Sequence, residues 1–134
     1  MIRLKTIDHI VLRVRDIERS LAFWRDVLNC PLERELTDVG LYQLRAGDCL
    51  IDLVPVDSEL GRMGGAAPGR EGHNMDHVCL RVENWDLAAI TAHLQSHGID
   101  APESGRRYGA DGFGQSIYIQ DPEGNTVELK GPPE

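Results

Sequence analysis

An internal repeat is the feature that most constrains how this chain folds. The segment Ile7-Asp8-His9-Ile10-Val11-Leu12-Arg13-Val14 returns as Met75-Asp76-His77-Val78-Cys79-Leu80-Arg81-Val82, with five of eight positions identical. A repeated segment of this kind is typical of a chain built from two copies of one structural unit. The sequence therefore predicts two equivalent modules.

Each copy of the repeat is expected to open a βαβββ module. The alternating, β-rich repeat predicts a strand, and Asp16 or Asn84 then predicts the N-cap of a helix, the second of which ends at Gly98. The apolar positions of the two helices are Ile17, Leu21, Trp24 and Leu28 in the first and Leu87, Ile90 and Leu94 in the second. Three further strands are expected in each half, over 32–36, 41–45 and 49–54 and over 103–108, 115–120 and 126–130.

Length and charge limit the domain organisation and the partners. The 134 residues suit one domain, with module one over about 1–55, a glycine-rich linker or active-site loop over about 56–74, and module two over about 75–134. The net charge of −8 disfavours nucleic acid and anionic membranes as partners. The start of the chain lacks the apolar core of a signal peptide, and three cysteines without a C-x-x-C pair suit a reducing compartment, so we expect a cytoplasmic protein.

Four candidate metal ligands fall on one face of the predicted strands. Side chains alternate across a strand, so the apolar residues around them face the helices and the candidates face the opposite way. If the two sheets curl toward each other, two imidazoles and two carboxylates converge: His9, Asp52, His77 and Glu128. Such a donor set suits a divalent ion, Zn²⁺, Ni²⁺, Fe²⁺, Mn²⁺ or Co²⁺, and does not select among them.

Three segments resemble the signatures of the vicinal-oxygen-chelate superfamily. They are Asp8–Val14, Phe23–Leu28 and Ile119–Leu129, and the likeness covers nearly the whole chain outside the linker. The superfamily includes glyoxalase I, fosfomycin-resistance proteins, extradiol dioxygenases and bleomycin-binding proteins. The resemblance implies an α+β fold of two βαβββ modules whose curved mixed sheets form a cup, often completed across a dimer, with a divalent metal held by each module's histidine and carboxylate.

The resemblance also implies a reaction. Enzymes of this kind chelate two neighbouring substrate oxygens on the metal and stabilise an enediolate-like anion. For this chain it implies a lactoylglutathione lyase-like isomerase acting on a small substrate such as a glutathione adduct, with Glu128 as both ligand and catalytic proton shuttle. Asp52 stands where the glyoxalase pattern usually has a glutamate, and Leu53-Val54-Pro55-Val56 lacks the Tyr and Asn that often follow that ligand.

Two other function classes remain open. Without Asp52, the set His9, His77 and Glu128 is that of ferrous extradiol dioxygenases and of thiol transferases of the fosfomycin-resistance type. A metal-free protein that binds an aromatic drug would not need these ligands, and only 5% of the residues are aromatic.

Several side chains are candidates for contact with substrate. Arg13 and Arg81 lie on the ligand side of their strands, and Arg107 and Phe113 lie in a glycine-rich stretch that forms either a rim over the cup or a long hairpin loop. Cys79 shares the ligand side but lacks a base or basic helix end, so we interpret it as a packing residue. Exposed strand edges favour a homodimer, although the two modules can also close within one chain.

Overall fold

The structure is a computed structural model that describes residues 1–100 and 103–134. It divides into two compact units, Met1–Asn74 and Met75–Glu134. The boundary falls immediately before the second copy of the sequence repeat. Each unit is described on its own below.

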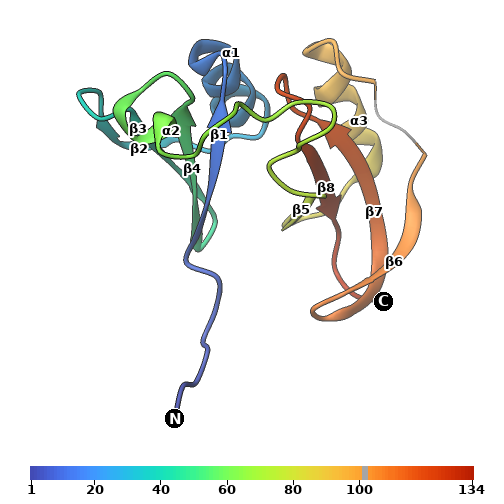
Figure 1. Cartoon of the computed structure of the whole chain (residues 1–134). Coiled ribbons are helices and arrows are strands. Elements are labelled where there is room, and N and C mark those ends of the chain that lie inside the picture. The colour runs from blue at the N-terminus through green and yellow to red at the C-terminus, as the bar shows by residue number, and fades with distance from the viewer. Residues whose placement is uncertain (101–102) are drawn as a thin grey trace. The chain divides into compact units, whose positions relative to one another are not determined.

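The first unit contains a four-stranded mixed sheet with helices (Figure 1). Its elements are β1 (His9–Val14), α1 (Ile17–Leu21), the π-helical segment η1 (Ala22–Val27), β2 (Leu32–Leu36), β3 (Leu41–Ala46), β4 (Cys49–Pro55) and α2 (Glu59–Arg62). The strand order is β1-β4-β3-β2, and the β1–β4 pair is parallel while the other two pairs are antiparallel.

The second unit repeats this topology. Its elements are β5 (Val78–Arg81), α3 (Leu87–Ser96), β6 (Gly105–Gly109), β7 (Gly112–Gln120) and β8 (Thr126–Lys130). The strand order is β5-β8-β7-β6, again with one parallel pair, β5–β8, followed by two antiparallel pairs. The two βαβββ modules predicted from the repeat are confirmed.

The helices depart from the predicted pattern at two places. Asp16 caps α1 as expected, accepting a hydrogen bond from the Arg19 backbone N–H, but the helix then widens into η1. The wider turn places Phe23 beside Trp24 in the core, whereas a regular helical period had predicted Leu28 there. In the second unit the prediction that Asn84 caps the helix is wrong, because Asn84 has φ 51° and Asp86 provides the cap.

The glycine-rich segments also contain more regular structure than predicted. The linker includes the short helix α2, whose N-cap is Ser58. The stretch from residue 105 to 114 is a hairpin of β6 and β7 with a tight turn, and not a long loop. The hairpin between β7 and β8 is fixed by the buried Asp121, whose carboxylate accepts hydrogen bonds from the backbone N–H groups of Glu123 and Asn125 and from the Asn125 side chain.

Each sheet has an apolar face and a polar one. The apolar faces form the core together with the helices. The largest fully buried aliphatic side chains of the core are Leu12, Val14, Leu44 and Leu53 in the first unit and Leu94, Ile117 and Val127 in the second. The buried charged residues of β4 and β8, Asp52, Glu128 and Lys130, alternate with these apolar positions and therefore lie on the opposite faces. The polar faces are where the candidate ligands lie.

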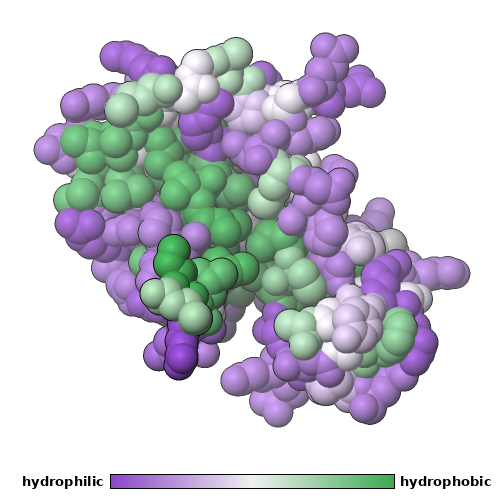
Figure 2. Space-filling view, turned by 60° about the horizontal axis from the view of Figure 1, so that its bottom comes forward, coloured by the Kyte–Doolittle hydropathy of each residue, from purple (hydrophilic) through white to green (hydrophobic). Residues whose placement is uncertain are grey.

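Some apolar side chains remain exposed. They include Met1, Ile2, Leu4 and Ile7, which precede β1, and Val11 within it. Figure 2 shows apolar residues gathered over part of the viewed surface and bordered by polar ones. No helix in the described part of the chain is long and apolar enough to cross a membrane.

Candidate metal centre

The first unit brings His9 and Asp52 to the same face of its sheet. Strands β1 and β4 run parallel, with Val11 opposite Asp52 and His9 opposite Leu50. Since partners across a ladder share a face and positions two apart in a strand do too, His9 and Asp52 point to the same side. The predicted pairing of one histidine with one carboxylate in this module is consistent with the register.

Asp52 has an unsatisfied oxygen. The residue is only 3% exposed, and its Oδ2 accepts a hydrogen bond of 3.2 Å from Gln43 Nε2. Its Oδ1 has no hydrogen-bond partner among the residues that the structure describes. A buried carboxylate oxygen without a donor is costly. It is also an available ligand atom for a cation.

The imidazole of His9 forms a hydrogen bond with the side chain of Asp8, the preceding residue. His9 Nδ1 lies 2.6 Å from Asp8 Oδ1. This hydrogen bond and, after it, the charge of Asp52 raise the pKa of His9, although desolvation acts in the opposite direction. The carboxylate of Asp52 thus favours the protonated form of His9.

The second unit brings His77 and Glu128 together directly. His77 Nε2 lies 3.5 Å from Glu128 Oε1, and the Glu128 side chain is 6% exposed. Glu128 is paired with Cys79 on β5 and with Tyr118 on β7, so all three lie on the polar face. An imidazole nitrogen and a carboxylate oxygen therefore face each other on this sheet.

The surroundings of Glu128 keep it ionised. Burial alone would raise its pKa, but hydrogen bonds from Tyr118, Cys79 and Ser116 together with the charge of His77 outweigh burial and lower it. The same contact with Glu128, followed by burial, raises the pKa of Tyr118. Glu128 is thus an anion at neutral pH, as a ligand or a general base must be.

The sequence places Lys130 on this face, but the sequence interpretation missed its burial and missed Ser116 and Tyr118 as residues of the face. Lys130 is 5% exposed and donates hydrogen bonds from Nζ to the carbonyls of Arg107 and Gly114, at 2.5 and 3.4 Å. The signal was present in the sequence, because Ser116 and Tyr118 alternate with the buried Ile117 and Ile119 along β7.

Cys79 lies on the polar face but is not activated as a nucleophile. Partial burial, followed by the hydrogen bond and charge of Glu128, raises its pKa to about 11. A thiol with such a pKa is almost entirely protonated at neutral pH. The thiol is partly buried beside Glu128, but the residue as a whole is exposed and so does not fill the packing role that we expected.

The predicted substrate-binding residues fall in different places. Arg107 lies on the polar face of the second sheet, donates to the Ser116 carbonyl and hydroxyl at 2.8 and 3.0 Å, and stacks over the Tyr118 ring at 4.5 Å. Arg81 forms an exposed ion pair of 2.7 Å with Asp111. Phe113 lies on the opposite face from Glu128, under the guanidinium of Arg106 at 3.9 Å.

Arg13 is engaged by the linker of its own unit. Its guanidinium donates to the carbonyls of Gly61, Gly65 and Ala66, at distances of 3.3, 3.1 and 2.9 Å. The Asn74 side chain forms two hydrogen bonds with the backbone of Arg13. It accepts one from the Arg13 N–H at 3.4 Å and donates one to the Arg13 carbonyl at 3.0 Å. Arg13 therefore holds residues 61–66 of the linker, and its last residue Asn74, against β1.

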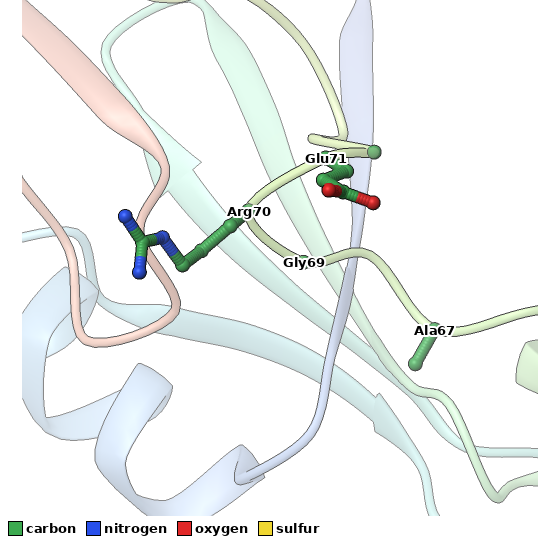
Figure 3. A pocket seen from close by; sticks show the side chains of 5 residues that line it. Ala67, Gly69, Arg70 and Glu71 are labelled. Carbon is green, nitrogen blue, oxygen red and sulfur yellow. The ribbon is translucent and has the colours of Figure 1, made fainter.

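A pocket in the linker does not contain the candidate ligands. It is lined by Ala67, Gly69, Arg70, Glu71 and Gly72. Figure 3 shows Arg70 and Glu71 projecting to opposite sides of the loop, so these two charged groups do not converge on a common ligand.

The donor chemistry of the two pairs fits a divalent metal. Within residues 1–100 and 103–134, no group of three or more His, Cys, Asp or Glu side chains is arranged to hold a metal ion. Each unit on its own offers one imidazole and one buried carboxylate, which are nitrogen and oxygen donors of the kinds that Zn²⁺ and similar ions accept. The unpartnered Oδ1 of Asp52 adds to this fit.

Comparison with known proteins gives consistent results. The sequence profile of the Glyoxalase/Bleomycin resistance protein/Dioxygenase superfamily matches residues 6–129. The chain is 25% identical over 126 residues to glutathione transferase FosA of Serratia marcescens, a match covering 94% of this chain and 80% of that protein.

Solved structures also resemble the chain. A virulence protein from Salmonella typhimurium matches with a TM-score of 0.77 and 25% identity, over 97% of this chain and 98% of that one. Lactoylglutathione lyase from Agrobacterium tumefaciens matches with a TM-score of 0.70 and 21% identity, over 96% and 95% of the two chains. The latter likeness supports the fold.

Proposed function

Because the chain belongs to the Glyoxalase/Bleomycin resistance protein/Dioxygenase superfamily, we propose that it is a metal-dependent enzyme of the glyoxalase I type. Its substrate is then a small molecule with two neighbouring oxygens, such as the adduct of a 2-oxoaldehyde with glutathione. His9, Asp52, His77 and Glu128 are the proposed ligands of one divalent ion, contributed by two modules of one chain or of a homodimer.

The observation that carries this proposal is the state of Asp52. Among the alternatives, only the glyoxalase-type site uses a fourth ligand at this position. Asp52 is buried, shares a face with His9 and keeps one carboxylate oxygen without a hydrogen-bond donor in the described part of the chain. A structural aspartate would normally satisfy both oxygens, as Asp121 does. The unused oxygen supports a role as a ligand.

The proposed roles of the other side chains follow from their contacts. A bound divalent ion supplies Lewis acidity that stabilises negative charge on the substrate oxygens. Glu128 is the general base, because its lowered pKa keeps Oε1 unprotonated next to His77 Nε2 and able to accept a carbon-bound proton. All three predicted arginine contacts already have protein partners, and Arg107 is the proposed contact for an anionic group of the substrate because it lies on the same face as Glu128.

Thiol transfer is a second candidate function. It is favoured by the similarity to a glutathione transferase across 94% of the chain. This reaction requires only His9, His77 and Glu128 as ligands in the interpretation given above, so Asp52 would be dispensable. The two functions therefore differ in what they predict for one variant.

Metal analysis and an isomerase assay test the proposal. The untagged protein should contain about one divalent ion per set of four ligands and should isomerise the methylglyoxal–glutathione adduct. His77→Ala should lose both properties, whereas His73→Ala, which changes an exposed linker histidine, should keep both. Equal metal content in parent and His77→Ala protein would contradict the assignment of His77.

The Asp52→Asn variant separates the candidate functions. Loss of isomerase activity in this variant supports the glyoxalase type. Formation of a glutathione adduct of fosfomycin by both parent and Asp52→Asn protein supports thiol transfer. Oxygen uptake with a catechol after anaerobic loading with Fe²⁺ would instead indicate a dioxygenase, and tight drug binding without metal would indicate a binding protein.

A further inference from the structure

The same hydrogen bond is built twice, once in each unit. His9 Nδ1 lies 2.6 Å from Asp8 Oδ1, and His77 Nδ1 lies 2.6 Å from Asp76 Oδ2. In both cases the carboxylate belongs to the residue that precedes the histidine. Both pairs stand at the start of the repeated segment, where the two copies of the sequence are identical.

The geometry is unusual for neighbours in extended chain. Successive side chains of a strand point to opposite faces, so a regular strand would keep such a pair apart. Strand β1 begins at His9 and strand β5 at Val78, so Asp8 and Asp76 lie outside the pleated ladder and can turn toward the imidazoles. The backbone of Asp8 is held in place, since its carbonyl accepts a hydrogen bond of 3.0 Å from the Leu50 N–H.

Fold stability does not explain these pairs. The side chains of Asp8 and Asp76 are 88% and 96% exposed, and exposed ion pairs contribute little to the free energy of folding. What the pairs do change is the chemistry of the ring. A carboxylate that accepts a hydrogen bond from Nδ1–H places the proton on that nitrogen and leaves the lone pair of a neutral imidazole on Nε2.

We propose that Asp8 and Asp76 are positioning residues that hold His9 and His77 as Nδ1–H tautomers and present Nε2 to the metal. This inference rests on the proposed metal centre. It agrees with the orientation of His77, whose Nε2 is the nitrogen that faces Glu128 Oε1. Carboxylates that bond the far nitrogen of a metal-ligating histidine orient the ring and raise its basicity.

The test combines metal affinity with a direct measurement of the tautomer. Zn²⁺ alone is titrated calorimetrically into the metal-free full chain and into Asp8→Ala, Asp76→Ala and the corresponding Asn variants. Each Ala variant should bind Zn²⁺ about 10–100-fold more weakly than the parent, as is usual when such a partner is removed. The Asn variants, which retain an acceptor oxygen without its charge, should lose less. Asp38→Ala, at an exposed turn aspartate that is not next to a histidine in the sequence, is the matched control and should bind as the parent does.

Nitrogen-15 NMR of the metal-free protein reports where the ring protons lie. We expect Nδ1–H and unprotonated Nε2 for His9 and His77 in the parent at a pH where the rings are neutral, and a mixture of tautomers after each Ala substitution. Circular dichroism verifies that the variants are folded.

The possible failures are distinguishable. A parent that binds Zn²⁺, with Ala variants within twofold of its affinity, overturns the role of Asp8 and Asp76 and leaves the metal centre intact. Protonated Nε2 on both rings in the parent also overturns it. A parent that binds none of Zn²⁺, Ni²⁺, Co²⁺, Mn²⁺ and Fe²⁺ overturns the proposed function and the inference together.

Discussion

Replacing Asp52 with asparagine should stabilise the metal-free protein and lower its affinity for a divalent metal ion. A buried carboxylate carries a desolvation penalty of several kcal/mol, whereas a buried amide with one unmet hydrogen bond costs about 1–3 kcal/mol. Removing the charge should therefore raise the free energy of unfolding by about 2 kcal/mol. About 1 kcal/mol of this is lost again because the hydrogen bond from Gln43 is no longer charge-assisted. The net gain of about 1 kcal/mol corresponds to about 4 °C in Tm for a domain of this size.

Calorimetric scans with a chelator and with Zn²⁺ measure both effects. A metal concentration of 100 times Kd should stabilise the parent by about 2.7 kcal/mol, and Asp52→Asn by clearly less. Asp121→Asn is the matched control, because Asp121 is also buried but accepts hydrogen bonds at both oxygens, so its metal-free Tm should fall by about 4–8 °C for a loss of about 1–2 kcal/mol. A metal-free Tm of Asp52→Asn below that of the parent would refute the argument from the unpartnered oxygen.

Three other expectations concern the polar faces and the linker. Because the pKa of Cys79 is raised to about 11, only about one thiol in 1,000 is ionised at pH 8, and its alkylation by iodoacetamide should quicken about tenfold per pH unit up to that pKa. Glu128→Gln removes a hydrogen bond and a charge that raise this pKa and should speed alkylation at pH 8, as peptide mass spectrometry would detect; an unchanged rate would contradict that contact. Arg13→Lys should lose at least two of the three carbonyl contacts and make residues 61–66 more sensitive to limited proteolysis, with Arg34→Lys as a control outside the linker.

The repeat made most of the fold predictable because the same alternation of apolar and polar residues occurs in both halves of the chain. Strands β2 and β8 have the predicted bounds, and the βαβββ order follows from two copies of one pattern. The faces of Asp52 and Glu128 were predictable for the same reason, since alternation with buried Ile51, Val127 and Leu129 leaves only one side for them. Period-two patterns are local and need no tertiary information.

What the sequence did not predict depends on contacts between distant residues. Nothing in the repeat indicates that Arg13 is engaged by linker carbonyls or that Lys130 is buried against the carbonyls of Arg107 and Gly114. Room for the lysine comes from glycines on β6 and β7, because a Cβ at Gly109 would lie 2.7 Å from Lys130 Cε and one at Gly114 would lie 3.3 Å from Lys130 Nζ. Only the pairing of β6, β7 and β8 brings these positions together.

The start of helix α3, which the sequence had predicted wrongly, can be tested by mutation. Asn84 has the composition of an N-cap but a left-handed φ of 51°, while the Asp86 side chain accepts a hydrogen bond of 3.1 Å from the Ala89 N–H. Serine caps helices as well as asparagine does but tolerates the left-handed region poorly, so Asn84→Ser should lower the free energy of unfolding by about 1 kcal/mol. Asn84→Gly should not lower it, since glycine adopts positive φ freely. If urea unfolding showed Asn84→Ser to be neutral and Asp86→Ala to be harmless, the helix would begin at Asn84 after all, and the left-handed turn before α3 would be refuted.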